Sequence, residues 1–285
     1  MHTFLYSVNF ILMIAMPLLL GWLISRRRSV GWRLFTIGCT TFIVSQLGHL
    51  PFNYFVLPIL NDQIGHLPET SGLIITAAFL GLSAAFFEEG ARYIGYRYWA
   101  KDARSWGKGM MLGAGHGGAE AIILGILVAI NTVLLLAWRN DRLLTLIPSE
   151  QAPLISASLD SFFSVPWYAA ILGAVERFFA IILHLSFSLM VMLAFVKKQP
   201  LWLAAAVLWH AIVDGIAVFS VAAWGVYVAE FLIAFMAIAS LVFILRIREP
   251  EPEIAAPIPL AQPEPTGILH IDVTADRLDD SRYFS

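Results

Sequence analysis

Charged side chains are scarce in this chain of 285 residues. Lys, Arg, Asp and Glu make up 13% of the sequence and hydrophobic residues make up 59%, whereas a soluble domain carries about 25% charged residues. The formal net charge is −2, so the chain lacks the basic excess that is typical of a nucleic-acid partner. The composition predicts a helical protein that crosses the lipid bilayer several times and binds no nucleic acid.

Several common signatures are also missing. Cys39 is the only cysteine, which excludes an intrachain disulfide and a multi-cysteine metal site. We find no Walker A loop, no G-x-G-x-x-G fingerprint and no H-E-x-x-H zincin motif. The N-terminus has no basic segment before its apolar run, because Arg26, Arg27 and Arg28 follow that run. This order favours an uncleaved first span over a signal peptide.

Long apolar runs dominate what is present. A membrane-spanning helix needs about 20 mostly apolar residues. The predicted spans cover residues 4–25, 33–60, 70–98, 108–138, 165–196, 200–220 and 223–246. The fold class is therefore an all-α polytopic bundle of seven spans, in which only Ala223, Trp224 and Gly225 separate the last two.

Basic residues mark alternate connections between these spans. They are Arg26, Arg27, Arg28 and Arg33, then Lys101, Arg104 and Lys108, then Lys197 and Lys198, and finally Arg246 and Arg248. Because cytosolic loops carry the excess of Lys and Arg, we expect the N-terminus outside and the C-terminus in the cytosol. Arg139 and Arg142 are an exception. They begin the connection up to Val165, which we interpret as an outer surface loop.

The composition changes after the last span. Residues 1–248 form the predicted transmembrane domain, and residues 249–285 are rich in proline and acidic side chains. Such a segment has too little apolar content to fold alone, so we predict a disordered cytosolic tail. Residues 268–273 have a brief strand-like pattern, which makes them a candidate site for a cytosolic partner.

Four ionisable clusters interrupt the apolar segments. They are Glu88-Glu89-x-x-Arg92, His116-x-x-x-Glu120, Glu176 with His184, and His210-x-x-x-Asp214. A charge at the bilayer centre costs roughly 2.5–3.5 kcal/mol or more, so such side chains usually face a protein interior and carry function. Counting about 1.5 Å per helical residue from the basic edges puts all four clusters about 12–20 Å deep. We therefore predict that they form one buried polar site.

The spacing within the clusters supports this prediction. His116 and Glu120 are four residues apart, as are His210 and Asp214, so each pair shares one face of its helix. Glu89 lies about 100° around the helix from the preceding acid and has a different environment.

Imidazoles and carboxylates in this pattern are suited to hydrolysis. They can hold Zn²⁺ with one position left for water, and the metal lowers the pKa of that water and polarises a carbonyl. Glu88 or Glu89 is then the general base, and Arg92 orients a carboxylate. A metal-free mechanism remains open, in which a glutamate activates water while His and Asp stabilise the oxyanion.

Buried ionisable residues also occur in membrane proteins that are not hydrolases. Glu88 and Arg92 could form a structural ion pair, and His116 and His184 could be interhelical hydrogen bonders. Buried acids and histidines also line proton or cation paths, so a coupled transporter is the main alternative, although the sequence lacks the repeated halves of many transporters. A non-catalytic scaffold is a third class. We interpret His49 as an interfacial residue.

The motifs resemble those of the YhfC-type intramembrane metalloproteases, a distant branch of the superfamily of CAAX proteases, bacteriocin-processing enzymes and PrsW-type proteases. The resemblance covers roughly residues 70–220. It is carried by Glu88-Glu89-x-x-Arg92, Gly115-His116-Gly117-x-x-Glu120, Glu176 through His184, and His210-x-x-x-Asp214. The prenyl-protease members usually have three residues before the arginine and an Asn in place of Asp214, so a prenylated substrate is not implied.

The resemblance implies a peptidase of the bacterial inner membrane, which acts on a membrane-associated peptide or protein through a site open to the cytosol. Glu88 would activate water, with Glu89 and Arg92 in support. The implied metal ligands or oxyanion stabilisers are His116, His184 and His210, with Glu120, Glu176 and Asp214 beside them. Zn²⁺ is the expected metal.

Overall fold

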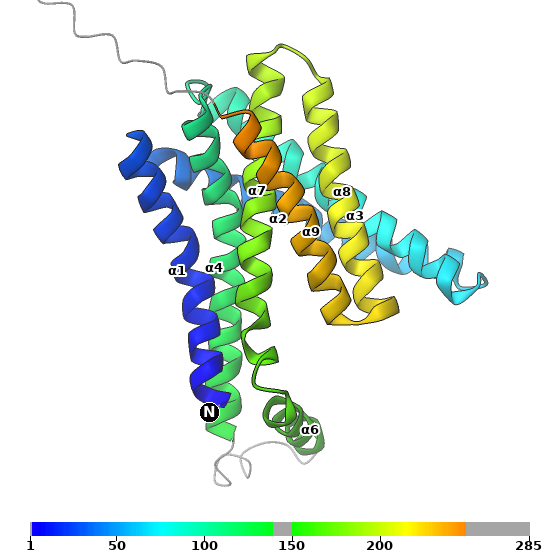
Figure 1. The fold of residues 1–285 in the computed structure, drawn as a ribbon. Coiled ribbons are helices and arrows are strands. Elements are labelled where there is room, and N and C mark those ends of the chain that lie inside the picture. Colours follow the sequence, from blue (N-terminus) through cyan, green and yellow to red (C-terminus); the bar gives the residue numbers. More distant parts are fainter. Residues whose placement is uncertain (1, 139–149, 249–285) are drawn as a thin grey trace, which may run out of the picture. The chain divides into compact units, whose positions relative to one another are not determined.

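The computed structural model describes residues 2–138 and 150–248, and within these ranges the chain is helical and contains no strand (Figure 1). The long helices are α1 (His2–Arg28), α2 (Arg33–Ile64), α3 (Glu69–Ile94), α4 (Trp106–Trp138), α7 (Leu172–Val196), α8 (Leu201–Trp224) and α9 (Val226–Arg246). A π-helical turn, η1 (Gly95–Trp99), extends α3, and a 3-10 turn, η2 (Ala169–Ile171), precedes α7. The predicted tail and both Arg139 and Arg142 lie outside the described residues.

Within residues 2–138 and 150–248, seven helices are long and apolar enough to cross a membrane, which confirms the seven predicted spans. The fifth span begins at Ala169 and not at Val165. Val165 is extended, as expected for the residue before a proline. The last two spans separate at Gly225, whose backbone has a φ of +87°, a conformation that glycine adopts without the strain of a Cβ.

One helix was not predicted. α6 (Ala152–Ser164) lies within the connection that we interpreted as a surface loop. Among its described side chains only Phe162 is buried, where it stacks on Tyr6 of α1 at 4.1 Å between ring centroids. In Figure 1, α6 is seen end-on and lies across the direction of α4 and α7. The helix therefore covers one end of the bundle while making few contacts with it.

α4 and α7 are packed against each other, and the other helices surround them. α1 packs on α4 and α7, α2 on α3 and α4, α3 on α8, and α9 on α7 and α8. We call one end of the bundle the basic end, where Arg26, Arg27, Arg28, Arg33, Lys101, Arg104, Lys108, Lys197, Lys198, Arg246 and Arg248 are found. We call the opposite end, where α1 begins, α4 ends and α6 lies, the α6 end.

An ion pair ties α2 to the connection between η1 and α4 at the basic end. Arg33 donates to Asp102 at 2.5 Å and to the Trp99 carbonyl at 3.0 Å. The Arg33 guanidinium holds the pKa of the Asp102 carboxyl below its usual range. Both side chains are exposed, and exposed pairs contribute about 0–1 kcal/mol. The pair therefore orients this connection more than it stabilises the fold.

Glycines set the distance between the helices that carry the clusters. A Cβ at Gly38 of α2 would overlap the Leu112 carbonyl of α4, and one at Gly81 of α3 would overlap the Ala211 carbonyl of α8. Glycine at such positions lets helix backbones touch, as is common in membrane proteins. Close approach of α2 to α4 and of α3 to α8 is what brings the polar side chains of these helices within bonding distance.

We expect Gly81→Ala to destabilise the protein, because its methyl group would meet backbone atoms of α8 that cannot move aside. Overpacking of this kind typically costs about 1–3 kcal/mol. Gly90→Ala is the matched control on α3, since a Cβ there meets no atom within 4 Å. The measurement is the free energy of unfolding in detergent micelles. A Gly81→Ala protein as stable as the Gly90→Ala protein would contradict this account of the α3–α8 contact.

Candidate functional site

The four ionisable clusters meet in the interior of the bundle. His116 of α4 lies 3.1 Å from Glu88 of α3, and His210 of α8 lies 2.7 Å from Glu89 of α3. His184 of α7 lies 2.7 Å from Glu120 of α4. These contacts, which join four helices, confirm the prediction that the clusters form one site.

Glu88 occupies the centre of this site. Its Oε1 accepts a hydrogen bond from Gln46 Nε2 of α2 at 3.1 Å. Its Oε2 lies 3.1 Å from His116 Nε2, 3.8 Å from Arg92 and 3.9 Å from His210 Nε2. The residue is 6% exposed. The carboxylate is thus surrounded by polar side chains of α2, α4 and α8 and by one buried cation.

Thr41 fixes which nitrogen of His116 carries the proton. Its hydroxyl lies 2.7 Å from the Gly38 carbonyl and 2.9 Å from His116 Nδ1. The single hydroxyl proton goes to the carbonyl, which can only accept, so His116 Nδ1–H donates to Thr41. A second partner that sets the tautomer in this way is usual for a metal-binding histidine. The Nε2 lone pair of His116 is then directed toward Glu88.

This assignment leaves two acceptors facing each other, His116 Nε2 and Glu88 Oε2, 3.1 Å apart. Such a contact needs a proton or a cation between the two atoms. Two ligands of a tetrahedral ion at 2.0–2.1 Å are separated by about 3.3 Å, so the observed spacing fits a metal. Glu88, His116 and His184 each offer one ligand atom, and these atoms lie within 4.8 Å of one another.

His184 is held between a cation and an acid. Arg92 donates to its Nδ1 at 2.5 Å, because a guanidinium has only donors. The other ring nitrogen of His184 therefore carries the proton and donates to Glu120 at 2.7 Å. Arg92 also pairs with Glu89 and has no exposed surface. Arg92 thus orients His184 and Glu89 from within the protein, and its contacts leave it no path to a substrate.

The surroundings of His210 differ from those of the other two histidines. Its Nδ1 is paired with Glu89 at 2.7 Å, its Nε2 lies 3.3 Å from Asp214, and its ring stacks on Phe187 at 4.5 Å. Both ring nitrogens already have carboxylate partners. Among the described residues, the set whose ligand atoms lie within 4.8 Å of one another contains Glu88, His116 and His184. His210, which we had grouped with the two other histidines, lies outside this set.

Reasoning from the sequence missed the contribution of α2. Thr41 and Gln46 touch the site, although the resemblance gave the first two spans little part in it. His49, which we interpreted as interfacial, lies between α2 and α3 and contacts Ser83 at 3.1 Å and Asn53 at 2.8 Å. The signal was present as a row of polar residues in an otherwise apolar span, at positions 41, 45, 46, 49 and 53.

A cavity of about 80 Å³ adjoins the cluster, and it has room for several waters at roughly 10–15 Å³ each. Its polar lining consists of Glu88, Glu120, Glu176, Arg177, His184, His210 and Asp214. The Arg177 guanidinium bridges Glu176 and Glu120. The side chains of Glu176 and Asp214 are 32% and 37% exposed, so the cavity reaches solvent-accessible surface on this side.

The cavity lies on the side of the cluster that faces the α6 end. It extends along α7 toward Glu176 and along α8 toward Ala217, which is toward the α6 end. On the other side, completely buried side chains separate the cluster from the basic end: Tyr96, Met111, Leu112 and Leu189. We had expected a site open toward the cytosol, which the positive-inside rule assigns to the basic end.

Seven apolar helices around a buried cluster of glutamate and histidine define a polytopic membrane protein with a candidate intramembrane metal centre. A family model described as YhfC intramembrane metalloprotease matches residues 12–237, and the chain therefore belongs to this family. A curated relative, the uncharacterized membrane protein YhfC of Bacillus subtilis (strain 168), is 29% identical over 192 residues, which cover 66% of this chain and 72% of the relative. No solved structure matches the chain.

The role assigned to Thr41 predicts that Thr41→Val weakens metal binding. Valine keeps the shape but cannot accept the His116 Nδ1 proton, and losing such an orienting partner typically costs about 10–100-fold in metal affinity. Thr41→Ser, which retains the hydroxyl, is the control. The measurement is zinc affinity by competition with a chelator in detergent. Equal affinities of the Val and Ser variants would show that Thr41 does not orient His116.

Proposed function

We propose that this protein is a metal-dependent endopeptidase that hydrolyses a peptide bond of a membrane-associated peptide or protein. The observation that carries the proposal is the buried approach of His116 Nε2 to Glu88 Oε2 at 3.1 Å, with His184 beside them. The family's description as an intramembrane metalloprotease supports the same chemistry. A coupled transporter is not favoured, because neither observation calls for one.

The residues present fit a zinc ion. Imidazole nitrogens and a carboxylate oxygen are among its usual ligands, and we assign them to His116, His184 and Glu88. When bound, the metal supplies an activated water and polarises the carbonyl of the scissile bond. His184 has to exchange one of its present partners, Arg92 or Glu120, before it can ligate.

Glu88 is the general base in this proposal. A base must reach the proton it removes, and Glu88 lines the cavity whereas Glu89 does not. The Oε2 of Glu88 faces His116 and the metal site, so the proton from water goes to Oε1, and Gln46 has to release this oxygen first. Glu89 is fully buried against Arg92 and His210, so we assign it the positioning of these two residues.

His210 is placed to act on the substrate oxygen. It lines the cavity together with Asp214, and Asp214 lies 3.3 Å from its Nε2. A donor that is fixed before the reaction stabilises the developing oxyanion more effectively than water does. We assign this role to His210 and the orientation of its ring to Asp214 and Glu89.

The seven apolar helices and the membrane-protein relative make this a multi-pass integral membrane protein. We place it in the plasma membrane of a bacterium, which is the inner membrane where a bacterium has two; the organism of that relative is bacterial. The substrate is then a peptide or protein anchored in, or bound to, the same bilayer.

This proposal predicts that Glu88→Gln abolishes cleavage with the fold intact. Loss of a general base lowers the rate by about 10²–10⁴-fold. Glu69→Gln, the same change at an exposed position of α3, should retain the wild-type rate. Substrates are found by comparing protein N-termini in membranes of cells that express each form, and rates are then measured in proteoliposomes. A Glu88→Gln protein that cleaves at the wild-type rate would refute the proposed mechanism.

A further inference from the structure

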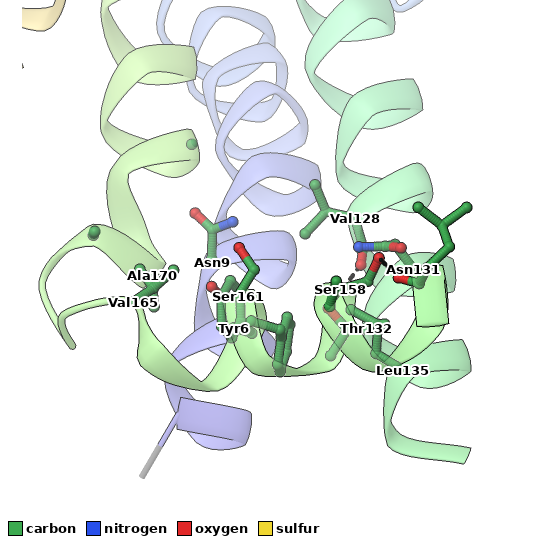
Figure 2. A pocket seen from close by; sticks show the side chains of 15 residues that line it. Tyr6, Asn9, Val128, Asn131, Thr132, Leu135, Ser158, Ser161, Val165 and Ala170 are labelled. Carbon is green, nitrogen blue, oxygen red and sulfur yellow. Dashed lines mark hydrogen bonds between the residues drawn. The ribbon is translucent and has the colours of Figure 1, made fainter. Parts of the chain in front are cut away.

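A second, larger cavity lies at the α6 end, between α1, α4, α6 and the start of α7 (Figure 2). Its volume is about 660 Å³. We call it the vestibule, and its polar lining consists of Tyr6, Asn9, Asn131, Thr132, Ser158 and Ser161. Amides and hydroxyls from three helices around one space are unlike a lipid-facing surface, where polar groups have no partners.

We call the cavity of about 80 Å³ beside the Glu88 cluster the catalytic cavity. On α4 the vestibule and the catalytic cavity share one helix face. Val128 and Asn131 line the vestibule, and Glu120 lines the catalytic cavity. Leu124 lies between them, so the four residues follow one another at intervals of four, four and three. This spacing keeps side chains on one side of a helix.

α7 repeats the arrangement. Gly173 lines the vestibule, while Arg177, Ala180 and His184 line the catalytic cavity, again at intervals of three and four. α4 and α7 pack directly against each other. The two cavities therefore follow one another along the same groove between these helices.

Little separates the two cavities within this groove. By the helical spacing, Leu124 falls between the residues that line the two cavities, and the ion cluster of Glu120, Glu176 and Arg177 lines the near side of the smaller one. Arg177 Nε is buried and has no hydrogen-bond partner among the described residues. Buried polar atoms are nearly always paired, with ordered water when no protein group is present. Arg177 Nε, on the side of the smaller cavity that faces the vestibule, therefore needs a water molecule as its partner.

Asn9 on the vestibule wall leads to the same conclusion. It is 4% exposed, and its Oδ1 accepts the Ala174 N–H at 2.7 Å. Within the described part of the chain, its Nδ2 meets the sulfur of Met13 alone, at 3.7 Å, and this sulfur is a weak acceptor. An amide N–H without an oxygen partner at the edge of a polar cavity is a hydration site.

We propose that the vestibule is the aqueous entrance of the catalytic cavity, through which water reaches Glu88 from the α6 end along the groove between α4 and α7. The use of this water in peptide hydrolysis rests on the function proposed above. The layer of Tyr96, Met111, Leu112 and Leu189 closes the route from the basic end. If the basic end is cytosolic, water arrives from the outer face of the membrane.

The test uses silver ion, a thiol-reactive cation that is close to water in size and is excluded by lipid. Cys39→Ser removes the only native thiol, and serine can still donate to the Gly115 carbonyl as Cys39 does. Single cysteines replace Ser158 in the vestibule, Ala180 in the catalytic cavity and Ile130, a 51%-exposed apolar residue of α4. Silver is added to one face of sealed proteoliposomes, and unreacted thiol is then labelled with a maleimide after denaturation.

We expect the Ser158 and Ala180 cysteines to react only from the α6 face, and the Ile130 cysteine to react from neither. Val128→Trp should slow the Ala180 reaction by more than about tenfold, because a large aromatic ring one turn from Leu124 narrows the passage between the two cavities. Ile130→Trp, on the apolar side of the same helix, should leave the rate of the Ala180 cysteine reaction unchanged. Val128→Phe replaces the tryptophan variant if the latter fails to fold.

Three results would overturn the proposal: reaction of the Ala180 cysteine from the basic face, no reaction from either face, or an unchanged rate when Val128 is enlarged. The readout requires no cleavage. Adding Glu88→Gln should leave the silver reaction unchanged, so a failure of the proposed peptidase activity would be seen separately from a failure of the proposed water route.

Discussion

The ion pair between Arg92 and Glu89 is the interaction on which the site depends. Both side chains are completely buried, and breaking a buried pair by removing one partner costs about 3–5 kcal/mol. Arg92 also donates to His184, and Glu89 accepts from His210. One cation and one carboxylate on a single turn of α3 therefore orient histidines from α7 and α8, to which we assign further roles in the proposed reaction.

Close contacts between helix backbones bring the remaining parts into place. Gly38 lets α2 approach α4 so closely that Thr41 reaches His116. Gly117 of α4 similarly faces the His184 side chain, where a Cβ would lie 2.8 Å from it. Small residues thus serve the site directly, because a larger side chain at either position would push an imidazole away from the acid that it contacts.

Much of this arrangement was predictable from the sequence. Mean hydropathy marks the spans. Pro166, which has no backbone N–H, precedes the start of the fifth span, and Gly225, which has no Cβ, separates the last two. The common depth of the four clusters predicted their meeting. The pairings were harder to foresee. A few tens of degrees of helix rotation decide whether His184 faces Glu176 on its own helix or Glu120 on the neighbouring helix α4, and in the structure it contacts Glu120.

Features that depend on tertiary packing could not be predicted. The row of polar residues in α2 indicates a polar helix face, but the partners of Thr41 and Gln46 depend on how α2 packs on α4 and α3. α6 was missed because its 13 residues are too few for a span, and Phe162 is its one firm anchor. The opening of the cavity toward the α6 end depends on which side chains fill each end of the bundle.

The central claim is that Glu88, His116 and His184 hold a metal ion. Elemental analysis of detergent-purified protein tests it most directly, with wild type beside His116→Ala and beside His49→Ala, which removes an imidazole outside the cluster. The account predicts about one zinc per chain in the wild type and in His49→Ala, bound by nitrogen and oxygen ligands alone, and its loss in His116→Ala. Wild-type protein without metal, or a metal content unchanged by His116→Ala, would contradict it.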